Sequence, residues 1–188
     1  MEHVVTKRLI IRRVAETDLL DFLAYHNHPD VLRYLPLEPI TEEQAMSFLA
    51  RQALVKIGDE GGYIMFAIHH VGDAKMIGEV CISLLPKAQS QGEIGWSLHP
   101  NYQGRGYATE AAQVLLNYGF AHHKLHRITS NCSPRNTASF RLMERLGMRR
   151  EGHLKQSKFM KGAWQDEYIY ALLLDEWLRL HRGETASE

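Results

Sequence analysis

The sequence predicts an α+β fold, arranged as α/β/α, in which helices pack on a central sheet of six to seven strands. Several segments alternate apolar and polar residues, or run apolar between turn residues, and these indicate strands. Two pairs of them are separated by short turns, so we expect a mixed, mostly antiparallel sheet. About four further segments place apolar residues at helical spacing. With 188 residues, 45% of them hydrophobic, the chain is expected to form a single domain.

The N-terminal elements follow from alternation and from capping residues. Leu9–Ile11 lie between arginines and indicate the opening strand. The Thr-Asp pair at 17–18 supplies N-cap chemistry for a helix over Leu19–His26. Prolines interrupt the segment that follows. The Thr41–Gln44 capping box then predicts a second helix, which runs to about Ile57.

The middle of the chain reads as three strands. A turn at Asp59–Gly62 precedes strands at Tyr63–His70 and Lys75–Leu85, which form a hairpin through residues 71–74. A third strand follows at Gly92–Leu98.

The C-terminal half alternates helices and strands. From Ala108, small and apolar residues recur at helical spacing and predict a helix that faces the sheet. Arg127–Asn131 indicates a strand, and a helix over 139–146 ends at Gly147, a residue suited to the position after a helix. A final hairpin is expected, with strands at Met148–Gln165 and Asp166–Leu174. Residues 183–188 are expected to form a frayed tail.

A loop with two glycines, between a strand and a helix, is the most informative segment. Gly104 and Gly106 release the backbone from Cβ restrictions where the chain turns into the helix. Unpaired N–H groups at such a turn, backed by the helix dipole, suit a phosphate group. No Gly-Lys-Ser/Thr follows, and two glycines do not make the dinucleotide fingerprint. An ordinary tight turn is the alternative interpretation.

The remaining pattern, Gln103-x-x-Gly106-x-Ala108, resembles the acetyl-CoA signature of the GNAT family of N-acetyltransferases. Asn136–Met148 resembles the second acetyl-CoA element of that family. Lys7–Arg12 and Gly162–Trp177 are similar to the opening and closing segments of its RimJ/RimL branch, the ribosomal-protein N-acetyltransferases. The resemblance covers residues 6–178 in the correct order, and it implies a sheet whose middle strands splay apart.

The resemblance implies acetyl-CoA as co-substrate. Backbone groups of the strand at 92–98 would hold the acetyl carbonyl and the pantetheine arm, and the N–H groups of residues 103–109 would hold the pyrophosphate. Arg105 would add charge at the rim. Asn136 would bond the pantetheine amide, although it could serve only as a helix N-cap. The residues expected to contact the cofactor are Trp96, Leu98, Gln103, Gly104, Arg105, Gly106, Ala108, Thr109, Asn136 and Ser139.

Glu93 is the expected general base. It lies on the strand face opposite the larger apolar residues Ile94, Trp96 and Leu98. Matching glutamates in RimJ/RimL-type enzymes are proposed to accept the amine proton, directly or through water. A solvated strand glutamate is the alternative interpretation.

Ser139 is the second expected catalytic residue. Many GNAT enzymes place a tyrosine seven residues after the motif asparagine as general acid for the CoA thiolate. This chain has Met143 there, which cannot donate a proton. Ser139 lies one helical turn earlier, so both side chains are expected to face one channel. A serine is a poor acid, so orientation of the thioester, or a hydrogen bond to its sulfur, competes with full proton transfer.

Composition limits the partners. Lys and Arg together number 22, as do Asp and Glu, so no basic surface for direct nucleic-acid binding is indicated. No apolar run is long enough to span a membrane and no signal pattern opens the chain, so we expect a cytoplasmic protein. Cys81 and Cys132 lack a C-x-x-C partner and His122–His126 fits the end of a helix, so no metal site is expected.

The expected function is acetyl transfer from acetyl-CoA to a primary amine by direct attack in a ternary complex. A protein N-terminal α-amine is the expected acceptor. Acetylation of a small-molecule amine, such as an antibiotic or a polyamine, would use the same residues. A non-catalytic acyl-CoA-binding regulatory domain is a further alternative, which only Met143 favours. The sequence leaves the acceptor open, as well as the choice between a monomer and a homodimer.

Overall fold

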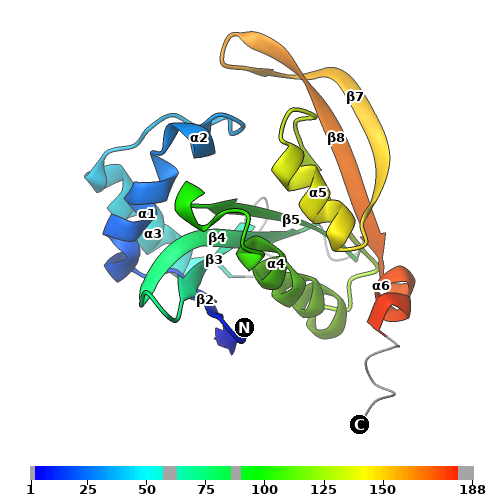
Figure 1. Ribbon diagram of the computed structural model, residues 1–188, viewed down its shortest axis with the longest axis horizontal. Helices are drawn as coiled ribbons and strands as arrows, with labels where there is room; N and C mark the ends of the chain where they lie inside the picture. Colours follow the sequence, from blue (N-terminus) through cyan, green and yellow to red (C-terminus); the bar gives the residue numbers. More distant parts are fainter. Residues whose placement is uncertain (1–2, 57–62, 86–89, 182–188) are drawn as a thin grey trace.

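The computed structural model describes residues 3–56, 63–85 and 90–181, which form an eight-stranded sheet with six α-helices (Figure 1). The strands are β1 (His3–Val5), β2 (Leu9–Arg13), β3 (Tyr63–His70), β4 (Lys75–Leu84), β5 (Gln91–Leu98), β6 (Arg127–Cys132), β7 (Arg149–Met160) and β8 (Ala163–Leu173). The helices are α1 (Leu19–His26), α2 (Pro29–Leu32), α3 (Glu42–Leu54), α4 (Tyr107–Asn117), α5 (Thr137–Arg145) and α6 (Leu174–His181).

The sheet is mixed and mostly antiparallel, as predicted. Its strands lie in the order β1-β2-β3-β4-β5-β6-β8-β7, and every neighbouring pair is antiparallel except β5–β6. The sheet has one strand more than expected, because β1 is an edge strand of three residues, too short to show a period. α2 and α6 are likewise additional. The N–H of Leu173 donates to Glu176 at 2.8 Å, which starts α6 where the pattern reads as the end of a strand.

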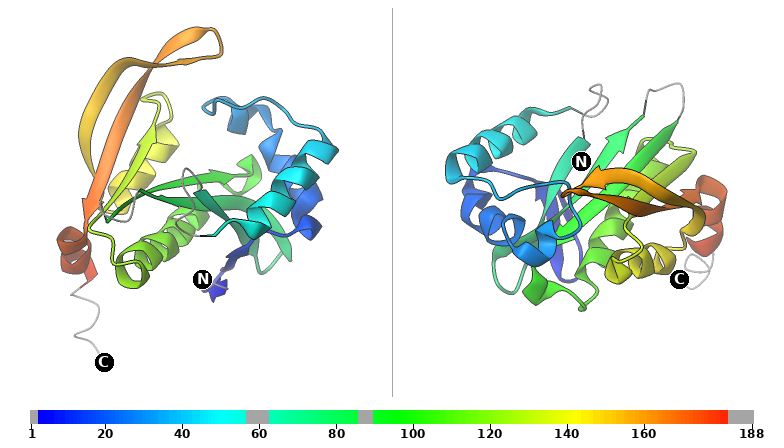
Figure 2. Two further views of the ribbon diagram at one scale, coloured as in Figure 1. Left: turned by 180° about the vertical axis from the view of Figure 1, so that it is seen from behind. Right: turned by 90° about the horizontal axis from the view of Figure 1, so that it is seen from above.

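Helices cover both faces of the sheet and give three layers. α1 and α3 pack on one face, where Phe22 and Leu49 share a cluster with Met65 of β3. α4 packs on the other face, where Leu115 shares the larger cluster with Phe66. Successive residues of β3 therefore point into two different cores, and the views in Figure 2 show the two helical layers. No helix within the described ranges is long and apolar enough to cross a membrane.

The sheet opens between β5 and β6. These strands pair over only three residues, Gln91–Glu93 against Arg127–Thr129. Beyond that point β5 continues along β4, and β6 continues along β8. Figure 1 shows the β6–β8–β7 part rising away from the rest of the sheet. This is the splay that the family resemblance implies, and Glu93 lies at the last pair before it.

The predicted boundaries that differ most from the structure are those of the C-terminal hairpin and the end of α3. The C-terminal hairpin turns at Lys161 and Gly162 rather than at 165–166. Their φ angles of 52° and 77° form the left-handed pair that a two-residue hairpin turn requires. α3 ends at Leu54 rather than near Ile57. Ile57, the predicted turn at 59–62 and the predicted tail at 183–188 lie outside the described residues.

Asp18 stands at the start of α1 but does not cap it as predicted. A 3-10 turn over Glu16–Asp18 precedes the helix. The buried carboxylate accepts the N–H of Ala15 at 2.9 Å and pairs with Arg12 at 2.6 Å. Asp18 therefore ties the beginning of α1 to β2.

Candidate active site

A groove of about 820 Å³ runs past the loop between β5 and α4 and along the first turns of α5. We call it the cofactor groove. It brings together most of the residues predicted to contact the cofactor, namely Trp96, Leu98, Gln103, Gly104, Gly106, Ala108, Thr109, Asn136 and Ser139. Arg105 does not line the groove. Its carbonyl instead accepts a hydrogen bond of 2.9 Å from Arg8.

The two loop glycines adopt the backbone that the turn requires. Gly104 has φ 74° and Gly106 has φ 81°. Gly106 is the N-cap of α4 and has no side chain to cap it. Within the described chain, no hydrogen bond uses the N–H groups of residues 104–106, and those of 107–109 lie in the first helical turn, where intrahelical partners are lacking. The loop therefore presents a row of free donors.

Gln103 stabilises the shape of this loop and does not add a free N–H donor to it. Its N–H donates to the Pro100 carbonyl at 3.1 Å, within a short 3-10 turn. Its side-chain amide donates to the Leu98 carbonyl at 3.0 Å. The free donors therefore begin at Gly104, one residue later than predicted.

Asn136 and Ser139 open α5 beside the groove. Asn136 is the N-cap, and its Oδ1 accepts the N–H of Ser139 at 3.2 Å. Its amide nitrogen donates no hydrogen bond within the described residues, so the capping role leaves a donor for a ligand. Ser139 is half-buried and lines both the groove and the neighbouring cavity.

Met143 does not face the channel, and that expectation is wrong. Its exposed fraction is 0%, and it packs in the large core with Ile128 and Tyr170. Arg141 and Arg145 of the same helix line the groove, so Met143 lies on the face of α5 that is turned toward the core. Ser139 and Met143 therefore lie in different surroundings, the cavities and the core, although they are four residues apart on one helix.

Arginines give the groove a positive charge. Arg33, Arg135, Arg141 and Arg145 line it, and Asp30, which pairs with Arg33 at 2.7 Å, is the acidic residue beside them. The other three guanidinium groups form no ion pair within the described residues. Guanidinium groups without carboxylate partners suit a ligand that carries phosphates.

A second cavity, of about 310 Å³, adjoins the groove at the splay. We call it the acceptor cavity. Residues 34, 35, 96, 97, 136 and 139 line both spaces, so the two meet where β5 and β6 part. Alternate residues of β4 and β5 point to one face of the sheet. The polar ones lining the cavity from that face are Glu79, Cys81, Glu93 and Ser97.

Glu93 is exposed and lies at the cavity wall, as part of a chain of polar contacts across the splay. Its Oε1 accepts a hydrogen bond of 2.7 Å from Asn131 of β6. The ammonium of Lys158 lies 3.4 Å from the Asn131 side-chain oxygen. The carboxylate is therefore held toward the opening between the strands.

Glu79 of β4 is a second carboxylate in this cavity, one that the family motifs do not identify. It lies opposite Ser97 of β5, and its Oε2 accepts a hydrogen bond of 2.5 Å from the Tyr25 hydroxyl. Burial raises the pKa of Glu79 to about 7, against the lowering effect of Tyr25. A carboxylate that titrates near neutral pH is suited to accept a proton and release it again.

One sequence signal does point to Glu79. It is the one charged residue between Met76 and Leu84, a strand that is otherwise apolar or small. A charge inside such a strand requires a partner or a function. Its partner Tyr25 lies 54 positions away, beyond the reach of any local motif.

Two free thiols complete the cavity wall. Cys81 and Cys132 both line it. Burial raises the pKa of Cys81 to about 12 and that of Cys132 to about 11, so both stay protonated near neutral pH. A protonated thiol is a poor nucleophile and a poor metal ligand. Across the described ranges, no group of three or more His, Cys, Asp or Glu residues is arranged to hold a metal ion.

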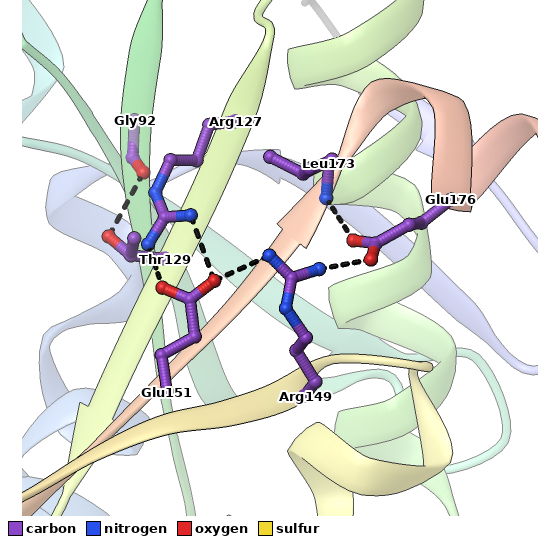
Figure 3. A network of polar contacts seen from close by, with 7 residues as sticks. All are labelled: Gly92, Arg127, Thr129, Arg149, Glu151, Leu173 and Glu176. Carbon is purple, nitrogen blue, oxygen red and sulfur yellow. Dashed lines mark hydrogen bonds and ion pairs between the residues drawn. The ribbon is translucent and has the colours of Figure 1, made fainter.

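An ion-pair network braces the base of the splay (Figure 3). Arg127 of β6 binds Glu151 of β7, and Arg149 joins Glu151 to Glu176 of α6. The Thr129 hydroxyl donates to a β5 carbonyl at 3.3 Å. The hydrogen bond from Arg127 holds the pKa of Glu151 below its usual value, so that carboxylate is charged at neutral pH. The network fastens the C-terminal hairpin beside the last β5–β6 pairs.

Comparison with known proteins identifies the family to which this geometry belongs. The Acetyltransferase (GNAT) domain matches residues 8–149. YnaD, an uncharacterized N-acetyltransferase of Bacillus subtilis strain 168, is 39% identical over 182 residues, which are 93% of this chain and 99% of that protein. The ribosomal protein uS5-alanine N-acetyltransferase of Escherichia coli strain K12 is 28% identical over 183 residues, 93% of this chain and 92% of that one.

A solved structure agrees with these sequence matches. The crystal structure of a GNAT-family acetyltransferase from Bacillus anthracis has a TM-score of 0.83 and 36% identity, and the match covers 92% of this chain and 99% of that chain. The chain therefore belongs to the GNAT family and is an N-acetyltransferase, with ribosomal-protein acetyltransferases among its relatives.

Proposed function

We propose that this enzyme transfers the acetyl group of acetyl-CoA to the N-terminal α-amine of a protein, by direct attack in a ternary complex. The meeting of the cofactor groove and the acceptor cavity at the splay carries the proposal. One space offers free N–H donors and arginines for phosphates, and the other offers two carboxylates for an amine. The Escherichia coli relative, named for a ribosomal-protein alanine, supports this acceptor class and a cytoplasmic place of action.

The groove fits acetyl-CoA in charge and in donor geometry. The N–H groups of residues 104–109 and the N-terminus of α4 would hold the pyrophosphate. The free edge of β5 beyond Glu93, together with the side-chain amide of Asn136, would hold the pantetheine arm. Arg141 and Arg145 are one turn apart on α5 and supply charge for the 3′-phosphate. Acetyl-CoA supplies the thioester carbonyl.

The carboxylates act on the amine. An amine must be neutral to attack, and an α-amine has a pKa of about 7.7–8.0, close to the raised pKa of Glu79. Glu93 at the splay receives the ammonium group, and Glu79 is the terminal proton acceptor. Strand register places Glu79 four positions along the sheet from Glu93, so the proton passes between them through water in the cavity. Sequence motifs indicated Glu93 alone as the base. The burial of Glu79 supports this division of roles.

Ser139 acts on the thioester side. It lines both spaces, so its hydroxyl can reach the acetyl-bearing sulfur. We assign it the orientation of the thioester and a hydrogen bond to the sulfur as it departs. Backbone N–H groups on the free edge of β5 stabilise the charge that develops on the carbonyl oxygen.

A small-molecule amine is the second candidate acceptor, and the size of the acceptor cavity favours it. A space of about 310 Å³ is at the lower limit for small-ligand sites, and it would accommodate a slender polyamine. The regulatory, non-catalytic alternative has only Met143 in its favour, and the cavity that holds Glu79, Glu93 and Ser139 argues against it.

A panel of acceptors tests the proposal. Acetyl-CoA is supplied with peptides that begin with alanine, serine or methionine, with the same peptides blocked at the N-terminus but carrying a lysine, and with spermidine and an aminoglycoside. CoA release and product mass are measured. We expect acetylation of free N-termini and none of the blocked peptides. Acetylation of spermidine or the aminoglycoside alone would establish the second candidate instead.

A further inference from the structure

Arg8 lies just before β2 and holds the phosphate-binding loop from a position 97 residues away. We propose that Arg8 is a positioning residue, which orients the loop N–H groups and neutralises a nearby carboxylate so that the pyrophosphate of CoA can bind. Arg8 does not line the cofactor groove, so it acts without touching the ligand. The inference rests on the proposed acetyl-CoA site.

Arg8 contacts three consecutive parts of the turn into α4. Its Nη1 donates to the Arg105 carbonyl at 2.9 Å, and its Nε donates to Glu110 at 2.8 Å. Its guanidinium carbon lies 4.5 Å from the centre of the Tyr107 ring. The planar guanidinium thus spans the loop, the helix start and the first helical turn. A lysine ammonium has no planar fork with which to reproduce this set of contacts.

The bond to Arg105 fixes the direction of a phosphate-binding donor. The carbonyl of Arg105 and the N–H of Gly106 belong to one trans peptide unit, so they point in opposite directions. Arg8 holds the carbonyl, and the N–H of Gly106 is thereby turned the other way. Gly106 lines the groove, and a Cβ added to it would meet the Arg8 guanidinium at 3.4 Å. That distance is an ordinary van der Waals contact, so the glycine is required by its φ of 81° and not by the arginine.

Arg8 also cancels the charge of Glu110. This carboxylate accepts the Thr6 hydroxyl at 2.6 Å and pairs with Arg8 at 2.7 Å. Although burial acts to raise the pKa of Glu110, the hydrogen bonds from Thr6 and Arg8 lower it overall, so the group is charged at neutral pH. Glu110 lies in the first turn of α4, the turn that presents donors to phosphate. Without Arg8, its charge would repel the pyrophosphate.

Calorimetry with CoA and steady-state kinetics test this role. We expect Arg8→Met to weaken CoA binding roughly tenfold and to raise the KM for acetyl-CoA by the same factor. The kcat at saturating acetyl-CoA and the KM for the acceptor should stay close to wild type. S-Acetylpantetheine lacks the pyrophosphate, so kinetics with this donor should not change. Arg8→Lys keeps the charge but not the fork, and should show an intermediate loss.

Two further variants separate positioning from stability. Arg12→Met removes another arginine of this region, one that pairs with Asp18 and does not line the groove, and should leave CoA affinity unchanged. Glu110→Gln in the Arg8→Met background should recover part of the affinity, because it removes the repelling charge. Equal losses with acetyl-CoA and S-acetylpantetheine, or unchanged CoA affinity in folded Arg8→Met and Arg8→Lys, would overturn the inference. Failure of the wild type to bind CoA would overturn the proposed function and this inference with it.

Discussion

The residues that line the cofactor groove come from three stretches of chain, within 30–35, 96–109 and 135–145, whereas those that line the acceptor cavity come from all six strands β3 to β8, the start of α5 and the segment after α2. A pyrophosphate is bound by successive N–H groups of one turn, so its site is formed by consecutive residues. An amine is bound by carboxylates that strand pairing brings together. The donor site therefore leaves a motif in the sequence, and the acceptor site does not.

The same comparison separates what each region contributes to the rate. Loss of a group in the groove should weaken acetyl-CoA binding and spare the proton transfer. Loss of a carboxylate in the cavity should slow the reaction and spare acetyl-CoA binding. Residues at the junction, above all Ser139, should affect turnover by smaller factors. Four predictions test this division.

Glu79→Gln should have the largest effect. If Glu79 is the terminal base, turnover should fall by roughly 10²–10⁴-fold while CoA affinity stays unchanged. The wild-type rate should rise with pH through about 7, the raised pKa of Glu79, because the ionised form accepts the proton. The variant should lose this limb of the pH–rate profile.

Two controls accompany this prediction. Glu93→Gln should lose turnover by a smaller factor and keep the limb near pH 7. The pKa of Glu79 is higher in the folded protein than in the unfolded chain, so its protonated form stabilises the fold. This stabilisation is complete below the unfolded-state pKa and is lost as the pH rises to about 7, the folded-state pKa. Glu79→Gln should therefore melt relatively higher than wild type above pH 7. If the limb of the pH–rate profile near pH 7 were lost in Glu93→Gln and kept in Glu79→Gln, Glu93 would be the base instead.

Gly106→Ala should affect the groove alone. Gly106 and Gly162 have φ angles of 81° and 77°, so an alanine at either position should cost a similar strain of about 1–2 kcal/mol. We expect CoA affinity to fall roughly tenfold in Gly106→Ala and to stay unchanged in Gly162→Ala. Calorimetry and melting temperatures measure both variants. Equal CoA affinities in the two variants would show that the pyrophosphate does not bind to this loop.

Ser139→Ala should reduce turnover modestly at saturating acetyl-CoA. A hydrogen bond to the departing sulfur corresponds to about 2- to 13-fold in rate. Met143→Ala should instead destabilise the fold by about 2–5 kcal/mol, since its side chain is fully buried, with near-normal turnover per folded molecule. Steady-state kinetics and chemical denaturation separate the two. A silent Ser139→Ala would refute the role of its hydroxyl.

Glu151→Gln should have the smallest effect. The network that it joins is partly exposed, with side-chain exposures of 23–44% among its members, so its loss should cost about 0.5–1 kcal/mol. Thermal melting should detect this change, while CoA affinity and acceptor KM remain those of wild type. A marked change in either constant would mean that the network also sets the width of the splay.

The sequence could predict the features that depend on neighbouring residues. The glycine loop, the capping box at Thr41 and the Asn136 cap all occur as read, because each is a contact over a few positions. Features fixed by packing could not be predicted. Met143 has the spacing of a channel residue, yet it packs in the core. Glu79 gains its raised pKa from burial, and its partner Tyr25 lies 54 positions away.

A crystal structure with a bisubstrate ligand would test the central claim most directly. In this ligand, CoA is joined through an acetyl linker to the N-terminal nitrogen of a peptide that begins with alanine. We predict that the pyrophosphate lies on the N–H groups of residues 104–109, and that the peptide nitrogen lies in the acceptor cavity within reach of Glu79 and Glu93. A peptide nitrogen bound away from both carboxylates, or a pyrophosphate bound elsewhere than this loop, would contradict the account.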